Sequence, residues 1–407
     1  MAEKRKKRYH GEGTIRQRAD GTFEVRATIV DIFGNKSRPS FYGKTADEAL
    51  AKKDEAVAKA RKNQYISPSK MTVGDWMDHW LWNIKRNKNP ESRKKKKKGT
   101  ISPKTFDHYE NLIRNHLLPY PIASIQITDL RRYNVQDWVD TLEDKEVGTR
   151  SISSVYGILR NAMNDAVKRE VIYESCVNRI DLPEEVTQKV QILTMPEQKI
   201  FLEAIKGHRL QAAFILALTT GMREGEIAAL TWKDIFFDDS YLIVNKDAVR
   251  IYDYDPDTHK RIGSRIIVQD MPKTDAGNRE IPLISLTSAA LAKHKAEQSN
   301  EKLKNVKLYQ DNNLVFCNEI GQLYDPKTLY TALRKICTNT DGLRKIKFHA
   351  LRHTFATTSL RQIKDPKALQ NLLGHETPEM ALHYTHVVEE QKREYVNGLE
   401  ELFPVDL

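Results

Sequence analysis

The sequence predicts a multidomain protein: a small three-stranded β-sheet plus helix N-terminal domain, an all-α middle domain, and a mixed, mainly α C-terminal domain with a small antiparallel sheet. A chain of 407 residues is longer than one ordinary compact domain. Apolar residues alternate with polar ones near the N-terminus, and further along they recur every three or four positions. Pro183 and mixed charges interrupt this periodicity over Asp181–Gln191, where we expect a linker. The expected domains are therefore residues 1–64, 70–180 and 192–407.

The first domain shows a strand-and-turn pattern after a basic tail. Positions 23, 25, 27 and 29 are apolar, whereas Glu24, Arg26 and Thr28 between them are polar, so one face of this strand should be buried and the other exposed. The pairs Asp20-Gly21 and Gly34-Asn35 are typical of turns. A capping box from Thr45 to Glu48 opens a helix that should end in the region 61–64. The three expected strands are Gly13–Arg18, Thr22–Val30 and Lys36–Tyr42.

Basic side chains gather on or beside these strands. We expect them to contact DNA phosphates, because the basic tail Lys4–Arg8 lies next to them in the sequence. The alternative interpretation is a solvated sheet face without a ligand. The four candidate DNA-binding residues are Arg16, Arg18, Arg26 and Arg38.

The middle domain is expected to be helical throughout. Trp76, Trp80 and Ile84 fall at i, i+4 and i+8 of a helix that begins after Thr72, and this stripe indicates core packing. Arg93 and the five lysines that follow it form a block of like charge that should be a mobile loop, either solvated or close to a DNA backbone. The other expected helices are Pro103–His116, Thr128–Leu142 and Thr149–Arg169.

The last domain combines helices with a few short strands. The expected strands are Tyr241–Val244, Ala248–Tyr252, Ser264–Val268 and Arg279–Pro282, in a single small antiparallel sheet. The expected helices are Pro196–Ile205, Leu210–Thr219, Arg223–Leu230, Leu286–Gln298, Pro326–Cys337, His349–Arg361, Asp365–Leu373 and Pro378–His383.

Composition restricts the class of partner and the compartment. The chain carries 66 Lys+Arg against 55 Asp+Glu, and this net charge of +11 favours a polyanion such as DNA or RNA. The longest apolar runs, such as Ala212–Leu218, are too short to span a membrane. Three scattered cysteines form neither a CxxC pair nor a disulfide framework, which fits a reducing cytoplasm.

Four segments of the last domain carry groups suited to phosphodiester chemistry. In the first, Gly221 precedes a helix whose first turn contains Arg223, a place where a guanidinium and free helix N–H groups would face an anion. An Arg–Glu pair such as Arg223 and Glu226 is also common on plain surfaces. The second segment, Met271–Pro282, reads as a hairpin that presents Lys273 at its tip.

The third and fourth segments are more specific. His349, Arg352 and His353 share one helical face, where an Arg–His pair would hold a phosphate. Two histidines at i and i+4 are also compatible with zinc, but HExxH is absent. In the fourth segment, Gly374 ends a helix, His375 follows it, and Tyr384 lies near the end of a short new helix.

Together, and in this order, these segments resemble the catalytic domain of the tyrosine recombinase (phage integrase) family over about residues 194–387. The specific parts are the HALRH segment and the LGH segment with its following tyrosine. The resemblance implies a site-specific DNA recombinase, with Arg223 and Arg352 on the scissile phosphate and Tyr384 as nucleophile. It further places the hairpin lysine of the family at Lys273, its two histidines at His349 and His375, and a supporting acidic residue at Glu226.

The resemblance extends to the architecture and to the partners. It implies a core-binding domain at residues 70–180, an arm-type DNA-binding domain at residues 1–64, and a homotetramer on double-stranded DNA with core and arm sites. An excisionase or host DNA-bending protein would assist, in a bacterial cytoplasm at the nucleoid and without a membrane. No metal, cofactor or ATP is expected. The alternatives are a non-catalytic sequence-specific DNA-binding regulator and a topoisomerase-like relative.

Overall fold

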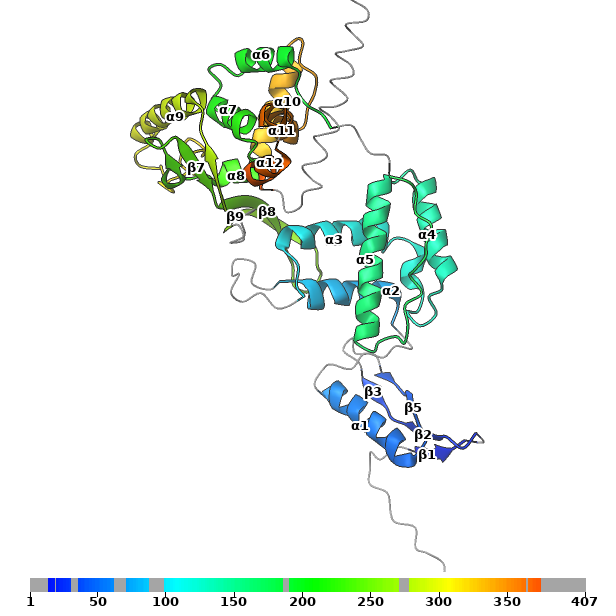
Figure 1. Cartoon of the computed structure of the whole chain (residues 1–407). Coiled ribbons are helices and arrows are strands. Elements are labelled where there is room, and N and C mark those ends of the chain that lie inside the picture. The colour runs from blue at the N-terminus through cyan, green and yellow to red at the C-terminus, as the bar shows by residue number, and fades with distance from the viewer. Residues whose placement is uncertain are drawn as a thin grey trace, which may run out of the picture. The chain divides into compact units, whose positions relative to one another are not determined.

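The computed structural model describes residues 14–18, 20–30, 36–61, 71–87, 99–185, 190–270, 278–363 and 365–374. The chain separates into two compact units, Met1–Val186 and Thr187–Leu407 (Figure 1). The boundary after Val186 falls inside the expected linker. The further division of the first unit into residues 1–64 and 70–180 stays a prediction.

The N-terminal sheet is antiparallel and contains β1 (Thr14–Gln17), β2 (Phe23–Arg26) and β5 (Ser40–Gly43) in the order β1-β2-β5. The short strands β3 (Ile29–Val30) and β4 (Lys36–Ser37) pair separately. The second and third expected strands are thus each divided in two. One cause is Pro39, which has no backbone N–H to donate to a neighbouring strand. Its carbonyl accepts a hydrogen bond from the Ala27 N–H at 3.4 Å.

The two faces of this sheet differ as the alternation predicts, with one exception. Val25 and Phe41 are register partners on the face that α1 (Ala46–Arg61) covers. Glu24, which we expected to point to solvent, is only 6% exposed. Its carboxylate accepts hydrogen bonds from Arg26 Nε at 2.8 Å and Ser40 Oγ at 2.6 Å, which compensate for the lost water.

The helical middle part contains α2 (Val73–His79), a π-helical segment Trp80–Lys85, α3 (Pro103–His116), α4 (Arg132–Asp144) and α5 (Thr149–Lys168). Trp76 and Trp80 are fully buried, as expected. Their indole N–H groups donate to Ala162 O and Asp165 Oδ2 on α5, both at 2.9 Å. Helix α4 begins later than predicted, because the Asn134 side chain accepts the Arg131 N–H at 3.0 Å and so caps the helix there.

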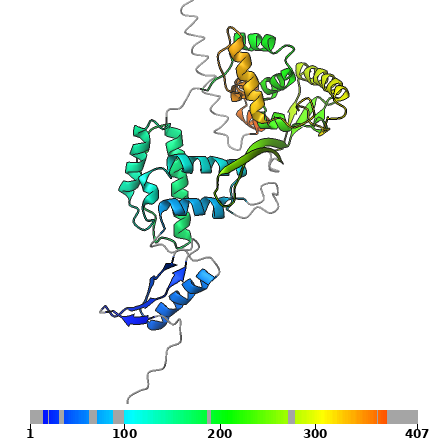
Figure 2. The ribbon, with the colours of Figure 1, turned by 180° about the vertical axis from the view of Figure 1, so that it is seen from behind.

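The second unit is built around α7, whose residues 212–217 are all buried. Helices α9 and α11 pack on α7 (Figure 2). The helices of this unit are α6 (Met195–Ala204), α7 (Gln211–Thr220), α8 (Glu224–Ala229), α9 (Ser285–Lys304), α10 (Pro326–Asn339), α11 (His349–Ile363) and α12 (Pro366–Leu373).

Two antiparallel sheets, where we expected one, occur in the described part of this unit. The first has the order β10-β7-β6, and the second pairs β8 with β9. The predicted Met271–Pro282 hairpin is therefore wrong: β9 and β10 on either side of residues 271–277 pair with different strands. Ile281 pairs with Leu242 and joins the main core, whereas Ile267 of β9 packs in a separate small cluster with Val249 and Ile251. The strands are β6 (Ile235–Phe236), β7 (Tyr241–Val244), β8 (Lys246–Tyr254), β9 (Arg261–Asp270) and β10 (Arg279–Pro282).

Within the described ranges, no helix has the length and apolar character needed to cross a membrane.

Candidate active site

The site begins at the turn between α7 and α8. Gly221 ends α7 in the left-handed conformation with φ +64°, and Arg223 is the N-cap of α8. Arg223 donates its backbone N–H to Glu226 Oε2 at 2.8 Å and its Nη1 to Glu226 Oε1 at 2.7 Å. The Arg223 side chain remains 34% exposed, so the guanidinium is held at one end and open to solvent on another side.

Glu226 is fully buried and ionised. Its carboxylate also accepts two hydrogen bonds from Arg279, Nη1 to Oε1 at 3.1 Å and Nη2 to Oε2 at 2.8 Å. Burial acts to raise the pKa of Glu226, but Arg279 above all, then Arg223 and Arg352, outweigh it and lower the pKa to about 2. The alternative of a surface Arg–Glu pair does not hold, because Glu226 is 1% exposed.

Sequence reasoning did not single out Arg279, although it is part of this cluster. Arg279 is 5% exposed and shares the buried face of β10 with Ile281, whereas Glu280 between them is exposed. An arginine at an inward position of a strand was the available signal, because a buried guanidinium needs a partner. The spacing alone did not identify Glu226 as that partner, since the two residues are 53 positions apart.

Arg352 lies on α11 and is 1% exposed. Its Nη1 donates to Gly221 O at 2.7 Å and its Nη2 to Leu373 O at 2.6 Å. Arg223 Nη2 lies 3.5 Å from the next carbonyl, that of Gly374. The two arginines thus converge on the C-terminal end of α12, which Gly374 caps with φ +64° as predicted.

His349 is the first residue of α11 and lies against His353, with ring centroids 4.6 Å apart. His349 is exposed as a residue, but neighbouring protein atoms remove part of the solvation of its ring. This loss of solvation, followed by the charges of Arg352 and Arg223, lowers the pKa of His349 to about 4. The imidazole is therefore neutral at neutral pH and is able to accept a proton. Among the described residues, no cluster of three or more His, Cys, Asp or Glu side chains surrounds this pair.

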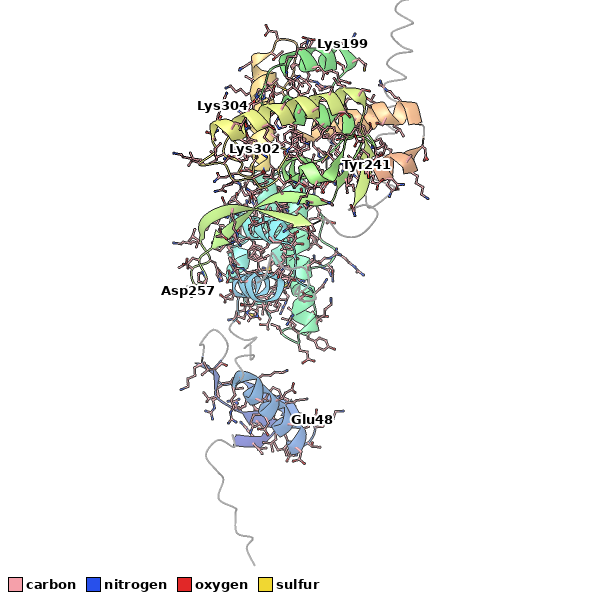
Figure 3. The ribbon with its side chains drawn as sticks, turned by 90° about the vertical axis from the view of Figure 1, so that its left-hand side faces the viewer. Glu48, Lys199, Tyr241, Asp257, Lys302 and Lys304 are labelled. Carbon is pink, nitrogen blue, oxygen red and sulfur yellow. The ribbon has the colours of Figure 1, made fainter. Side chains whose placement is uncertain are left out.

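Several predicted residues lie outside the described part of the chain. These are Lys273, His375, Tyr384, the lysine block 94–98 and the expected helix Pro378–His383. Two other tyrosines pack against hydrophobic neighbours. Tyr241, which Figure 3 labels, stacks its ring on that of Phe236 with the ring centroids 4.6 Å apart, and Tyr330 packs against the main core.

The four arginines of the N-terminal sheet are all exposed. Arg16 is the register partner of Glu24, on the face opposite Val25, and Arg18 lies over the Tyr42 ring at 5.2 Å. Arg26 is on the same face and is bound to Glu24. Arg38 lies outside the strands, between β4 and β5.

Family models match two parts of the chain. The model of the phage integrase family matches residues 186–391, which include the whole cluster around Glu226. The model of the phage integrase N-terminal SAM-like domain matches residues 94–142.

Known proteins resemble nearly the whole chain. A XerC-like tyrosine recombinase from Caldanaerobacter subterraneus subsp. tengcongensis is 31% identical over 94% of this chain and 96% of its own length. Among solved structures, the Tn1549 transposon integrase bound to transposon right-end DNA has a TM-score of 0.61 and 21% identity over 80% of this chain and 100% of its own. A lambda integrase dimer bound to a core site has a TM-score of 0.52 and 19% identity over 93% and 96%. The two structural likenesses show a shared fold.

Proposed function

This chain belongs to the phage integrase family and is a tyrosine site-specific recombinase, and on that basis we propose that Tyr384 cuts and rejoins DNA at a phosphate held by Arg223 and Arg352. One observation carries the assignment of residues. Arg223 at the N-cap of α8 and Arg352 on α11 converge on the carbonyls of Gly374 and Leu373, immediately before His375 in the sequence. The binding site and the segment with the nucleophile are thus joined at the end of α12.

The charge of this cluster suits the reaction. Arg223, Arg279 and Arg352 contribute three positive charges and ionised Glu226 one negative charge, so their sum is +2. Attack of a tyrosine oxygen on a phosphodiester gives a pentacoordinate transition state with more negative charge than the ground state. Preorganised guanidinium groups stabilise that charge where it develops, in the place of a metal ion.

Proton transfers complete the mechanism. A phenol with an ordinary pKa near 10 is a weak nucleophile, and neutral His349 accepts its proton. Lys273 protonates the leaving 5′-oxygen, and His375 donates a hydrogen bond to a phosphate oxygen. The 3′-phosphotyrosine keeps the energy of the broken bond, so a 5′-hydroxyl from a second duplex reseals the strand without ATP.

The partner in this proposal is double-stranded DNA, bound at core sites by residues 70–180 and 192–407 and at arm sites by residues 1–64. Exchange between two duplexes requires several protomers, for which we propose a homotetramer on DNA. An excisionase or a host DNA-bending protein would set the direction of recombination. The site of action is the bacterial nucleoid in the cytoplasm.

Incubation with a nicked suicide duplex that carries the core site tests the assignment. The wild-type chain should form a covalent protein–DNA adduct in the presence of EDTA, and Tyr384→Phe should bind the duplex without forming one. A Phe variant that still forms adducts would move the nucleophile elsewhere, and loss of the wild-type adduct in EDTA would contradict the metal-free reaction. A non-catalytic regulator would bind and form no adduct at all.

A further inference from the structure

Glu226 is shared by two arginines that have different environments. Arg223 is partly open to solvent, whereas the Arg279 side chain is 3% exposed and donates to both carboxylate oxygens of Glu226. Each carboxylate oxygen accepts one hydrogen bond from Arg279 and one from Arg223. Both oxygens are therefore fixed in position by Arg279 before DNA arrives.

Arg279 also reaches the end of α12. Its Nε donates to Leu372 O at 2.9 Å. The next two carbonyls, of Leu373 and Gly374, face Arg352 and Arg223. Three arginines thus donate to three successive carbonyls. Of these, Arg279 also donates to both carboxylate oxygens of Glu226 and so connects Glu226 to the end of α12.

We propose that Arg279 is a positioning residue for strand cleavage. By donating to both carboxylate oxygens of Glu226, Arg279 keeps this carboxylate from turning fully toward Arg223. The Arg223 guanidinium then stays available to the scissile phosphate. By holding Leu372 O, Arg279 fixes the helix end that leads to His375. This inference rests on the proposed function, in which Arg223 binds the phosphate.

The charge of the cluster makes the proposal testable. In Arg279→Gln the remaining charged groups of the cluster are Arg223, Arg352 and Glu226, so its net charge falls from +2 to +1. Glu226 then keeps only Arg223 as an arginine partner. The double variant Arg279→Gln/Glu226→Gln removes one positive and one negative charge and restores +2. If Arg279 acts through Glu226, the second substitution should repair part of the damage caused by the first.

The experiment measures two quantities on the core-site suicide duplex: the Kd, and the single-turnover rate constant of adduct formation. We expect Arg279→Gln to reduce the rate constant by about 100-fold, the scale of a misplaced reacting group, while the Kd changes by less than about threefold. The double variant should cleave at least about tenfold faster than Arg279→Gln.

Arg209→Gln is the matched control. Arg209 also forms a two-point pair with a glutamate in this unit, from Nε and Nη2 to the two carboxylate oxygens of Glu301 at 2.9 and 2.6 Å. Its loss should lower the melting temperature and leave the cleavage rate of the folded protein unchanged.

Three results would overturn the proposal: wild-type cleavage by Arg279→Gln, a double variant no faster than the single one, or a rate that falls only in step with the melting temperature, as in the control. Where Arg279→Gln does not fold, the double variant carries the test by itself. A folded double variant within about tenfold of the wild-type rate supports the role, and a folded but inactive one refutes it. If the wild-type chain forms no adduct, the proposed function itself fails, and this outcome is distinct from the others.

Discussion

At the scale of single residues, the arginines of the cluster act through geometry as well as charge. Arg352 donates to carbonyls at the ends of two helices, Gly221 O after α7 and Leu373 O at α12. A planar guanidinium reaches two acceptors at fixed directions, whereas an ammonium is a point charge. The family resemblance singled out Arg223 and Arg352 as candidate phosphate-binding residues, and these roles stay predictions. The resemblance did not identify Arg279, because its pairing with Glu226 joins two elements that are 53 positions apart in the sequence.

Arg352→Lys should therefore impair both cleavage and stability. We expect a loss of about 100-fold or more in the rate of adduct formation and about 1–3 kcal/mol in the free energy of unfolding, because one buried carbonyl loses its donor. Arg334→Lys, at an exposed position of α10, is the control and should behave as wild type. Adduct kinetics and denaturant unfolding measure the two effects. Wild-type kinetics in Arg352→Lys would refute the role of the guanidinium geometry.

The pH dependence should reflect His349. Its pKa is about 4 in the folded chain against 6.5 ordinarily, so the imidazole stays neutral and able to accept a proton down to about pH 5. The cleavage rate should then be nearly flat between pH 7 and 5. Between pH 6.5 and 4 the unfolded chain binds a proton at this position that the folded chain does not, so the contribution of His349 to stability falls as the pH falls.

Rate–pH profiles and unfolding curves between pH 5 and 8 measure these two effects, and His349→Gln should remove this part of the stability loss. An acid limb in the cleavage profile with an apparent pKa near 6.5 would contradict the neutral-base assignment.

At the scale of elements, the turn from α7 into α8 carries Arg223 and is held to Arg352 on α11 through the carbonyl of Gly221. Gly221 has φ +64°, and a Cβ there would lie 2.5 Å from Phe355 Cδ1 and 2.8 Å from Leu373 Cδ2. A side chain there would force the partly buried Phe355 side chain or the buried Leu373 side chain to shift. These contacts lie beside the Gly221 carbonyl, which accepts from Arg352.

Gly221→Ala should thus destabilise the second unit more than strain at φ alone does. Gly207→Ala is the matched control, because Gly207 has φ +72° and a Cβ at this position would meet no other atom within 4 Å. The control should lose about 1–2 kcal/mol from backbone strain, and Gly221→Ala should lose more and cleave more slowly. Equal unfolding free energies for the two variants would mean that the contacts at Gly221 are unimportant.

Local patterns predicted the elements better than their pairing. The strands Tyr241–Val244 and Arg279–Pro282 and the helix Pro103–His116 occur at the predicted residues. The predicted pairing of β10 with the strand before it was wrong, because the partner of a strand is decided by which strand lies beside it in the fold, and that strand can be far away in the sequence. Two-residue β6 is too short to give a periodic signal, and the buried position of Glu24 depends on Ser40, which is 16 residues away.

At the scale of the whole molecule, the division of labour between domains is open to a direct test. If residues 1–64 bind arm sites, their deletion removes Arg16, Arg18, Arg26 and Arg38 and leaves the Glu226 cluster intact. The truncated chain should cleave a core-site suicide duplex at the normal rate, and it should fail to recombine full sites that carry flanking arms. Each lost phosphate contact should reduce the logarithmic salt dependence of arm-DNA binding by roughly 0.9. Unchanged arm binding and integration would assign the N-terminal sheet another role.

The identity of the covalent bond tests the central claim most directly. The wild-type chain should be trapped on a core-site suicide duplex, digested with a protease and a nuclease, and the nucleotide-bearing peptide sequenced by mass spectrometry. We expect a single modified residue, Tyr384, joined to a 3′-phosphate, with a free 5′-hydroxyl on the released strand. A linkage at any other residue, or one to a 5′-phosphate, would contradict the mechanism.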